Sequence, residues 1–530
     1  MVWLRPMAAE HAAAAHPLAS EQRILGAEDR HFYELETHGA EPGRPHMSPI
    51  SAIKNSAAAP TEIPMLINGE WRAASETYAV RDPYRGTVVS NAPRSSLADL
   101  DDALNAAVQA KAKAAATPAY ERAALLRRAA KLLIERADFI AEFMSRETGK
   151  AIKDAKAEIV RSQDTLTLSA EEAVRIEGEH VPLDASAMGA GKICFMLRFP
   201  VGVVAGITPF NAPVNLACHK IAPAIAAGNT LVLKAPPQSP GVIHELARIF
   251  VDAGTPAGVL NVLYGETIGP ALVRDPRVDF ITFTGSSRVG GEIKAASGLR
   301  RVALELGGNG VTIVHQDASI EQAAPICGRN AMRLAGQSCI SVQTVYVHRS
   351  IYDKFVALVV AEVKKLKLGD PLDPTTDVGT LIDERAAQRV EAWINDAANG
   401  GAKVLVGGKR HGAQIEPTVI AGVKPDMKVV CEEVFGPVVS LLPYDDIDEV
   451  FRTVSASRFG LQTGIFTASM ELAIRAVRNL RTGGVIINGS STWRTDQLAY
   501  GGVKDSGIGR EGPRYSIRDM TEERMVLFNY

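Results

Sequence analysis

Long apolar runs, paired cysteines and an excess of one charge are all missing from this 530-residue sequence. No uncharged apolar stretch reaches the roughly 18 residues that a membrane-spanning helix needs, so no such helix is predicted. The 58 Lys and Arg residues balance 60 Asp and Glu residues, which argues against nucleic acid or an anionic membrane as a partner. Five cysteines without a CxxC pair argue against a disulfide framework and against a metal site, and they favour the reducing cytoplasm.

The length of the chain predicts two or three domains, because a single hydrophobic core does not grow to this size. Residues 1–64 are rich in Ala, His and Pro and lack the features of a secretory signal. We interpret them as a leader, and the sequence leaves open whether it is disordered, a cap, or upstream of a true start at Met47. After Met65, the stretch Leu-Ile-Asn-Gly-Glu-Trp predicts a strand, a tight turn and a second strand.

A repeated alternation of strands and helices begins at Val201. Such apolar strands, each separated from the next by a helical stretch, indicate a parallel sheet that is covered on both faces and binds ligands beyond its carboxyl ends. A second alternating region begins near Gly307. The strands predicted in the first region are Val201–Ile207, Thr230–Lys234, Val259–Leu263, Asp279–Thr284 and Arg301–Glu305.

Three further expectations concern the helices and strands around these regions. Apolar spacing predicts one long helix from Tyr120 to Ser145. A turn at Phe199–Pro200 is predicted between the strands Ile193–Leu197 and Val201–Ile207. The closing segment Glu523–Tyr530 predicts an exposed edge strand, and such an edge invites a partner chain.

Five positions at strand ends or in loops carry side chains suited to chemistry. Ser286, in a strand-to-helix turn, predicts a place for a phosphate, and Lys234 supplies a cation beside it. Glu305, between apolar residues, is suited to act as a general base, and the amide of Asn211 is suited to hold an oxyanion. Cys339 follows a helical run and a glycine, where it is either a buried small hydrophobe or an attacking thiolate. Each residue alone is more often structural, but together they predict an active site.

The order of the motifs resembles the aldehyde dehydrogenase superfamily from about Met65 to the C-terminus. Eight pieces in the same order make the resemblance specific. They are Thr208-Pro-Phe-Asn211, Leu233-Lys234, Phe283-Thr-Gly-Ser286, Leu304-Glu-Leu-Gly-Gly308, Gly336-Gln-Ser-Cys339, Glu432-Glu-Val-Phe-Gly-Pro437, Ile487-Asn488-Gly489 and Gly501-Gly502-Val-Lys-Asp-Ser-Gly507.

The resemblance implies an α/β fold with three parts. A Rossmann-like NAD(P)-binding domain with a parallel sheet would comprise residues 65–181 and 201–306, and an α/β catalytic domain would comprise residues 307–502. Residues 182–200 and 503–530 would form a small β oligomerisation domain. A homodimer or homotetramer is expected.

The resemblance also implies the reaction, which is oxidation of an aldehyde to a carboxylic acid. Cys339 would attack the aldehyde, Asn211 and the Cys339 N–H would hold the oxyanion, and Glu305 would activate the water that hydrolyses the thioester. The other four cysteines are expected in the core. The positions that would bind the cofactor are Thr208, Pro209, Phe210, Lys234, Gly285, Ser286, Glu433 and Phe435.

Two departures from the family pattern concern the cofactor and the substrate. Pro237 stands where many members carry a glutamate that repels a 2′-phosphate, so either NAD or NADP is expected. Ala212, Asn215 and His219 replace aromatic or bulky residues and make a wider, more polar wall.

The predicted substrate is a short polar or anionic aldehyde. Arg333 matches an arginine of relatives similar to succinate-semialdehyde dehydrogenase, and Trp493 and Arg494 lie in the loop that usually lines the pocket rim. Three alternatives stay open. They are an aromatic aldehyde of the benzaldehyde or vanillin type, transfer of the acyl group to CoA, which Glu305 argues against, and a non-catalytic binding or structural relative.

Overall fold

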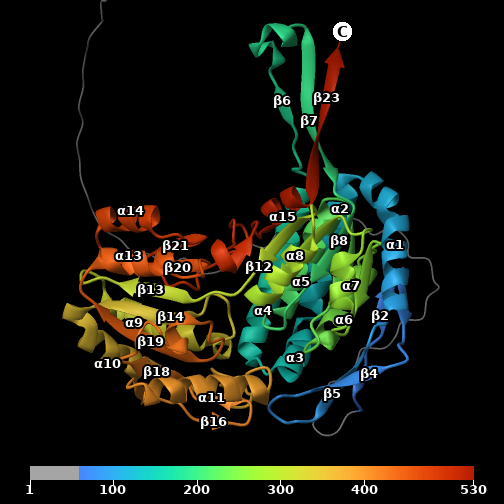
Figure 1. Ribbon diagram of the computed structural model, residues 1–530. Coiled ribbons are helices and arrows are strands. Elements are labelled where there is room, and N and C mark those ends of the chain that lie inside the picture. The colour runs from blue at the N-terminus through green and yellow to red at the C-terminus, as the bar shows by residue number, and fades with distance from the viewer. Residues whose placement is uncertain (1–58, 530) are drawn as a thin grey trace, which may run out of the picture. The chain divides into compact units, whose positions relative to one another are not determined.

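Two open sheets with helices on their faces make up most of the described chain (Figure 1). The computed structural model describes residues 59–529, so most of the leader predicted for residues 1–64 lies outside the described residues. None of the helices within residues 59–529 combines the length and the apolar content that crossing a membrane takes.

The first sheet has the strand order β22-β12-β11-β8-β9-β10-β2-β3. Its five central strands are parallel, as predicted, and β8 is buried along its whole length because helices cover both faces. The bounds are β2 (Met65–Ile67), β3 (Glu70–Arg72), β8 (Val203–Ile207), β9 (Thr230–Lys234), β10 (Leu260–Leu263), β11 (Phe280–Thr284), β12 (Arg301–Glu305) and β22 (Gly507–Ile508).

The helices of this region bury their apolar faces against the sheet and against each other. Helix α1 begins at a capping box, in which Ser96 and Asp99 satisfy each other's backbone N–H groups. Helix α5 is buried along its whole length and packs against α4. The bounds are α1 (Leu97–Ala116), α4 (Ile152–Ala173), α5 (Pro213–Ala226), α6 (Pro240–Asp252), α7 (Ile268–Arg274) and α8 (Ser287–Ala296).

The single helix predicted from Tyr120 to Ser145 is wrong, because the structure has two helices, α2 (Ala119–Glu135) and α3 (Ala137–Thr148). Arg136 leaves the helical conformation at φ −107° and ψ 10°. Its Nη2 lies 2.5 Å from Asp252 Oδ2 at the end of α6. The apolar spacing continues across this one-residue break, so the sequence pattern does not reveal it.

The turn predicted at Phe199–Pro200 is also wrong, because β7 (Lys192–Pro200) continues through both residues, and only Val201 and Gly202 separate it from β8. The reason is a distant partner: β23 (Thr521–Asn529) pairs antiparallel with β7, from Thr521 opposite Pro200 onward. With β6 (Glu179–Val181), these strands form a flap in which β23 is an edge strand, as the sequence predicts.

The second sheet has the order β15-β18-β19-β14-β13-β20-β21. The chain enters β14 directly after Cys339, which places this residue at the amino end of the sheet. The bounds are β13 (Gly310–Val314), α9 (Ile320–Met332), β14 (Val342–His348), α10 (Tyr352–Val363), α11 (Glu384–Asn399), β15 (Lys403–Val406), β18 (Thr418–Ala421), β19 (Val438–Tyr444), α13 (Ile447–Ala456), β20 (Gln462–Phe466), α14 (Met470–Asn479) and β21 (Gly484–Ile487).

A buried ion pair holds the start of α5, and its loss is expected to destabilise the fold. Lys150 pairs with Glu158, which also accepts hydrogen bonds from the N–H groups of Val214 (2.9 Å) and Asn215 (3.1 Å). Lys150→Ala would leave the Glu158 carboxylate buried without its cation and cost about 3–5 kcal/mol of unfolding free energy. Urea denaturation measures this cost. Lys131→Ala, at an exposed lysine, is the control, and an equal effect in both variants would contradict the prediction.

Candidate active site

The loop before Cys339 has an unusual backbone. Leu334 and Ala335 both adopt left-handed conformations, with φ of 55° and 50°, and Gly336 follows at φ 70°. A Cβ on Gly336 would lie 1.9 Å from the carbonyl oxygen of Gly436, so only glycine fits this contact. Non-glycine residues in this region cost about 1–3 kcal/mol each and cluster at functional sites.

The Cys339 thiol is half-buried among Ile340, Leu461 and Tyr500. Its Sγ lies 3.1 Å from the Tyr500 hydroxyl oxygen. Burial raises the pKa of Cys339 to about 11, and the hydrogen bond with Tyr500 opposes this shift. The thiol is therefore placed for attack but needs help to ionise.

Two N–H donors lie at the same loop. Asn211 Nδ2 donates to the carbonyl oxygen of Gln337 at 3.1 Å, two residues before Cys339. The Cys339 N–H has no hydrogen-bond partner among residues 59–529. Asn211 does not act as the helix cap, since Ala212 occupies the N-cap position of α5. The arrangement is suited to hold an oxyanion formed at the sulfur.

The carboxyl group of Glu305 is buried at the carboxyl end of β12. Its Oε2 has no hydrogen-bond partner in the described part of the chain. Burial raises the pKa of Glu305 well above 4.5 and the charge of Glu511 raises it further, while Arg494 and Lys220 oppose the shift. A carboxyl group with such a pKa can accept a proton near neutral pH.

Three buried residues that the sequence analysis did not identify, Lys220, Tyr500 and Glu511, adjoin the predicted Arg494. Arg494 donates to Glu511 Oε1 at 2.6 Å, and its guanidinium lies 3.6 Å from the centre of the Tyr500 ring. Lys220 Nζ donates to Thr284 at 2.7 Å and lies 3.9 Å from Glu511. His219 and Arg494 lower the pKa of Glu511 to about 2 against the effect of burial, so its carboxylate is charged at neutral pH.

A second group of charges adjoins Arg494. His219 Nε2 lies 3.0 Å from Asp496 Oδ1 and 3.3 Å from Arg494 Nη2. Arg161 also contacts Asp496, through Nη2 at 2.6 Å and Nε at 3.1 Å, and its side chain is 37% exposed. Burial would raise the pKa of Asp496, but His219 and Arg161 hold it well below its usual range. His219 Nδ1 and Arg494 Nε are buried and have no partner within residues 59–529, which is unusual unless a ligand or water satisfies them.

The predicted substrate residues are only partly brought together. His219 and Arg494 are neighbours, but the Trp493 side chain is exposed, and its carbonyl accepts from Gln462. Arg333 is outside this hydrogen-bond network, because its Nε lies 3.3 Å from Asp154 and its side chain is 58% exposed.

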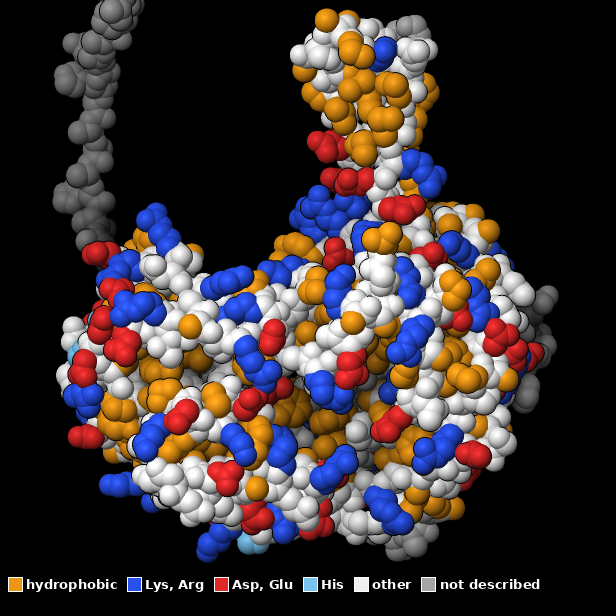
Figure 2. Space-filling model, in the orientation of Figure 1, with side chains coloured by type: hydrophobic (Ala, Val, Ile, Leu, Met, Phe, Trp, Pro, Cys, Tyr) orange, Lys and Arg blue, Asp and Glu red, His pale blue; other side chains and the backbone are white. Residues whose placement is uncertain are grey.

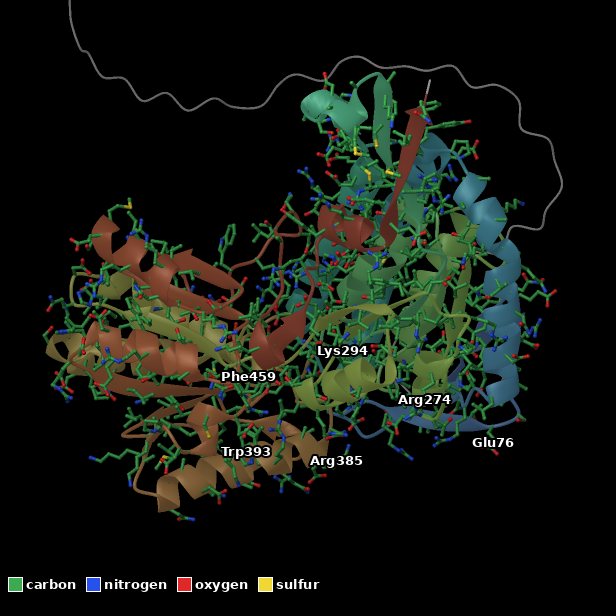
Figure 3. The ribbon with its side chains drawn as sticks, turned by 45° about the horizontal axis from the view of Figure 1, so that its top comes forward. Glu76, Arg274, Lys294, Arg385, Trp393 and Phe459 are labelled. Atoms are coloured by element: carbon green, nitrogen blue, oxygen red, sulfur yellow. The ribbon has the colours of Figure 1, made fainter. Side chains whose placement is uncertain are left out.

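The predicted phosphate-binding turn has the expected geometry. Ser286 is the N-cap of α8, and its hydroxyl accepts from the Val289 N–H. A Cβ on Gly285 would lie 2.4 Å from the Phe283 ring, so a side chain does not fit there. In Figure 3, the labelled Lys294 lies in the last turn of α8, at the end of this helix away from Ser286, and Trp393 lies on α11.

The neighbouring strand ends supply further polar groups. Lys234 ends β9 and has no ion-pair partner in the described part of the chain; burial lowers its pKa to about 8. The Thr208 hydroxyl is buried and also lacks a partner within residues 59–529. These groups fit a nucleotide cofactor, because unsatisfied donors and a helix N-terminus are what its phosphates and ribose hydroxyls require.

Glu433 and Phe435 lie on the side of the second sheet. Glu433 Oε1 accepts from the Gly308 N–H at 3.1 Å, and burial raises its pKa to about 7. The ring of Phe435 is 6.1 Å from that of Phe210, and Pro209 is half-buried beside Phe210. The chain therefore brings residues from both sheets together around the loop of Cys339.

One expectation about the cysteines is wrong. Cys194, Cys218 and Cys327 are buried as predicted, but Cys431 is exposed. It is the last residue of the single helical turn α12 (Lys428–Cys431), whose buried side is formed by Val429 and Val430.

Known proteins with similar sequences identify the family of this chain. Residues 71–526 match the model of the aldehyde dehydrogenase family. The 3-sulfolactaldehyde dehydrogenase of Priestia megaterium is 45% identical over 469 residues, covering 88% of this chain and 98% of the relative. The chain therefore belongs to the aldehyde dehydrogenase family, whose members are NAD(P)-dependent enzymes, and the predicted fold, enzyme class and cofactor class are confirmed.

Two solved structures are also similar. Aldehyde dehydrogenase 21 from Physcomitrella patens, in complex with the reaction product succinate, is 39% identical with a TM-score of 0.86, covering 89% of this chain and 99% of that one. The NADP-dependent glyceraldehyde-3-phosphate dehydrogenase of Bacillus halodurans, complexed with NADP, is 36% identical with a TM-score of 0.86, covering 88% and 99%.

The raised pKa of Glu305 predicts a pH dependence. If Glu305 is the base that activates water, only its ionised form works, so kcat should fall as the pH drops through a value well above 4.5. Steady-state kcat measured from pH 5 to 9 tests this, and Glu305→Gln should lose the acidic limb along with most of the rate. A wild-type kcat that stays constant down to pH 5 would refute the role.

Proposed function

We propose that the protein oxidises a short anionic aldehyde to its carboxylic acid with NAD or NADP. One observation carries the proposal: a thiol, an amide donor, a buried carboxyl group without a partner and a group of arginines meet around Cys339. The thiol and the carboxyl group supply a nucleophile and a base, and the arginines supply the charge that selects the substrate.

The residues take part in four steps. The Cys339 thiolate forms a C–S bond to the aldehyde carbon, and the carbonyl oxygen becomes an oxyanion held by Asn211 and the Cys339 N–H. NAD or NADP, held by Lys234, Ser286 and Glu433, would supply the acceptor for the hydride of this carbon, which would leave a thioester on Cys339. Glu305 takes a proton from water as the water attacks the thioester. The C–S bond then breaks, which releases the acid and restores the thiolate.

The anionic end of the substrate would bind near Arg161 and His219. Arg161 uses Nε and Nη2 for Asp496, which leaves Nη1 without a partner among residues 59–529. His219 Nδ1 is likewise unsatisfied in the described chain. The N–H groups of arginine recognise carboxylate, sulfonate and phosphate through charge-assisted hydrogen bonds. We therefore assign the anion to this part of the site and not to Arg333, because no hydrogen bond within residues 59–529 joins Arg333 to His219, Arg494 or Asp496.

The names of the relatives support this choice. They refer to 3-sulfolactaldehyde, to succinate as a product and to glyceraldehyde-3-phosphate, all of which carry an anionic group. An aromatic aldehyde is less favoured, because the groups around His219 are charged. Transfer to CoA and a non-catalytic role are less favoured because Cys339, Glu305 and Asn211 are all present and in place.

We propose that both NAD and NADP are accepted, with Lys234 near the adenosine ribose, Ser286 at the pyrophosphate and Glu433 at the nicotinamide ribose. Pro237 offers no carboxylate to repel a 2′-phosphate. We also place the enzyme in the cytoplasm, supported by five free cysteines, and keep the three domains as predicted from the sequence. Activity measured with each cofactor, and cell fractionation, test these assignments.

An aldehyde panel with matched variants tests the substrate. Arg161→Met should raise KM for an anionic aldehyde such as succinic semialdehyde about 10- to 100-fold, the loss expected for a charge-assisted hydrogen bond, and change KM for neutral butanal little. Arg333→Ala is the control and should leave both values unchanged. Equal losses for both aldehydes in Arg161→Met would contradict the anion site, whereas NAD(P)H formation by Cys339→Ala would contradict the reaction itself.

We propose further that the flap joins copies of this chain into a homodimer or homotetramer. Apolar side chains gather on its surface (Figure 2), among them Ile193, Phe195 and Phe528. A small ribbon of this kind does not bury its own apolar face. Helix α14 offers a complementary apolar stripe, since Met470 and Ile474 are exposed one turn apart.

The proposed homodimer or homotetramer predicts the mass of the protein in solution. Light scattering after size-exclusion chromatography should give a whole-number multiple of the chain mass, and Phe195→Glu should reduce it towards a single chain, because a buried unpaired charge opposes association. Val108→Glu, at an exposed apolar residue on α1, is the matched control. A wild-type protein that elutes as a single chain would contradict this proposal.

A further inference from the structure

The Tyr500 hydroxyl contacts the atom on which the proposed reaction depends. Its oxygen is 3.1 Å from Cys339 Sγ, and no other side chain within residues 59–529 forms a hydrogen bond to this sulfur. Asn211 and the Cys339 N–H are placed for the substrate oxygen rather than for the sulfur. The phenol is thus the one described group that can act on the thiol directly in the free enzyme.

The position of this phenol is fixed by contacts on every part of the residue. The Tyr500 N–H donates to the Glu511 carbonyl oxygen at 2.9 Å, and the Glu511 N–H donates back at 2.6 Å. Arg494, which is bonded to the Glu511 carboxylate, covers the ring at 3.6 Å from its centre. Backbone, ring and hydroxyl are therefore held together, and the hydroxyl has little freedom to turn away from the sulfur.

The Tyr500 hydroxyl is suited to donate a hydrogen bond to Cys339 and not to accept one from it. Burial raises the pKa of Tyr500 well above 10, so its hydroxyl keeps its proton throughout the neutral range. A thiolate has no proton, and so in the ionised pair only the phenol can be the donor. A cation over an aromatic face draws electron density from the ring, and Arg494 thereby strengthens the O–H as a donor.

We propose that Tyr500 is a further catalytic residue, whose hydroxyl donates a hydrogen bond to the Cys339 thiolate and raises the fraction of the nucleophile that is ionised before the aldehyde arrives. Ionisation releases the thiol proton to water, and no other reactant is needed. When sulfur attacks the aldehyde, the negative charge passes to the substrate oxygen, and the donors at Asn211 and the Cys339 N–H take over. The inference rests on the proposed role of Cys339 as the nucleophile.

Thiol alkylation in the absence of aldehyde and cofactor tests this role. The thiolate displaces iodide from iodoacetamide, so the rate at each pH from 6 to 10.5 reports the ionised fraction of each cysteine, followed by peptide mass spectrometry. Tyr500→Phe should shift the profile of Cys339 to higher pH by about one unit, which is about a tenfold slower reaction at neutral pH. The exposed Cys431 is the internal control and should keep its profile.

A second variant separates the effect of the hydrogen bond from a general disturbance of the fold by the substitution. Difluorotyrosine at position 500 keeps the shape of the residue and makes its hydroxyl a stronger donor, so the Cys339 profile should shift to lower pH. A profile that is unchanged in either variant overturns the inference. If Tyr500→Phe unfolds, the buried Cys218 and Cys327 become alkylated, and the difluorotyrosine enzyme alone then decides by the direction of its shift. Because no aldehyde is used, this result is independent of which substrate the enzyme oxidises.

Discussion

The ion pair between Arg494 and Glu511 is the interaction on which the site depends. Both side chains are buried, and a charge at such a place survives only with a partner. Both residues of the pair also contact other residues of the site. Arg494 covers the Tyr500 ring and lies near His219, and Glu511 lies near Lys220. Through these contacts, one interaction influences the electrostatic surroundings of Cys339, Glu305 and the proposed anion site.

The same surroundings explain why two carboxyl groups in one site behave differently. Glu305 has no hydrogen-bond partner for Oε2 in the described chain, and its pKa is raised by burial. Glu511 has cations on both sides, and its pKa is lowered. One carboxylate thus stays charged and holds the arginine, while the other has a raised pKa and, once ionised, is the better proton acceptor.

Sequence reasoning succeeded where the information is local. The strands Thr230–Lys234 and Arg301–Glu305 are observed with the predicted ends, because each is a short apolar run with a polar residue at its close. The break at Arg136 and the extension of β7 to Pro200 depend on partners far along the chain, at Asp252 and on β23. No pattern of spacing contains such partners.

The candidate site shows the same contrast between local sequence information and contacts with residues far along the chain. Cys339, Glu305 and Asn211 could be predicted as candidates because they stand at strand ends or in loops beside recognisable motifs. Arg161 and Lys220 lie in the middle of helices, where a charged residue usually faces water, and only their contacts with Asp496 and Glu511 reveal them. Tyr500 and Glu511 flank the glycine-rich stretch that ends the second region, and this position was the one available signal for them.

The last part of the chain has a consequence for synthesis. Tyr500 and Glu511 precede α15 (Pro513–Asp519), and the segment between them contributes β22, in which Gly507 pairs with Glu305. Domains generally fold from the amino end as the ribosome elongates the chain. A nascent chain can therefore pair strands of both sheets before Tyr500 and Glu511 emerge, so the surroundings of Cys339 are completed only after most of residues 59–529 have been made.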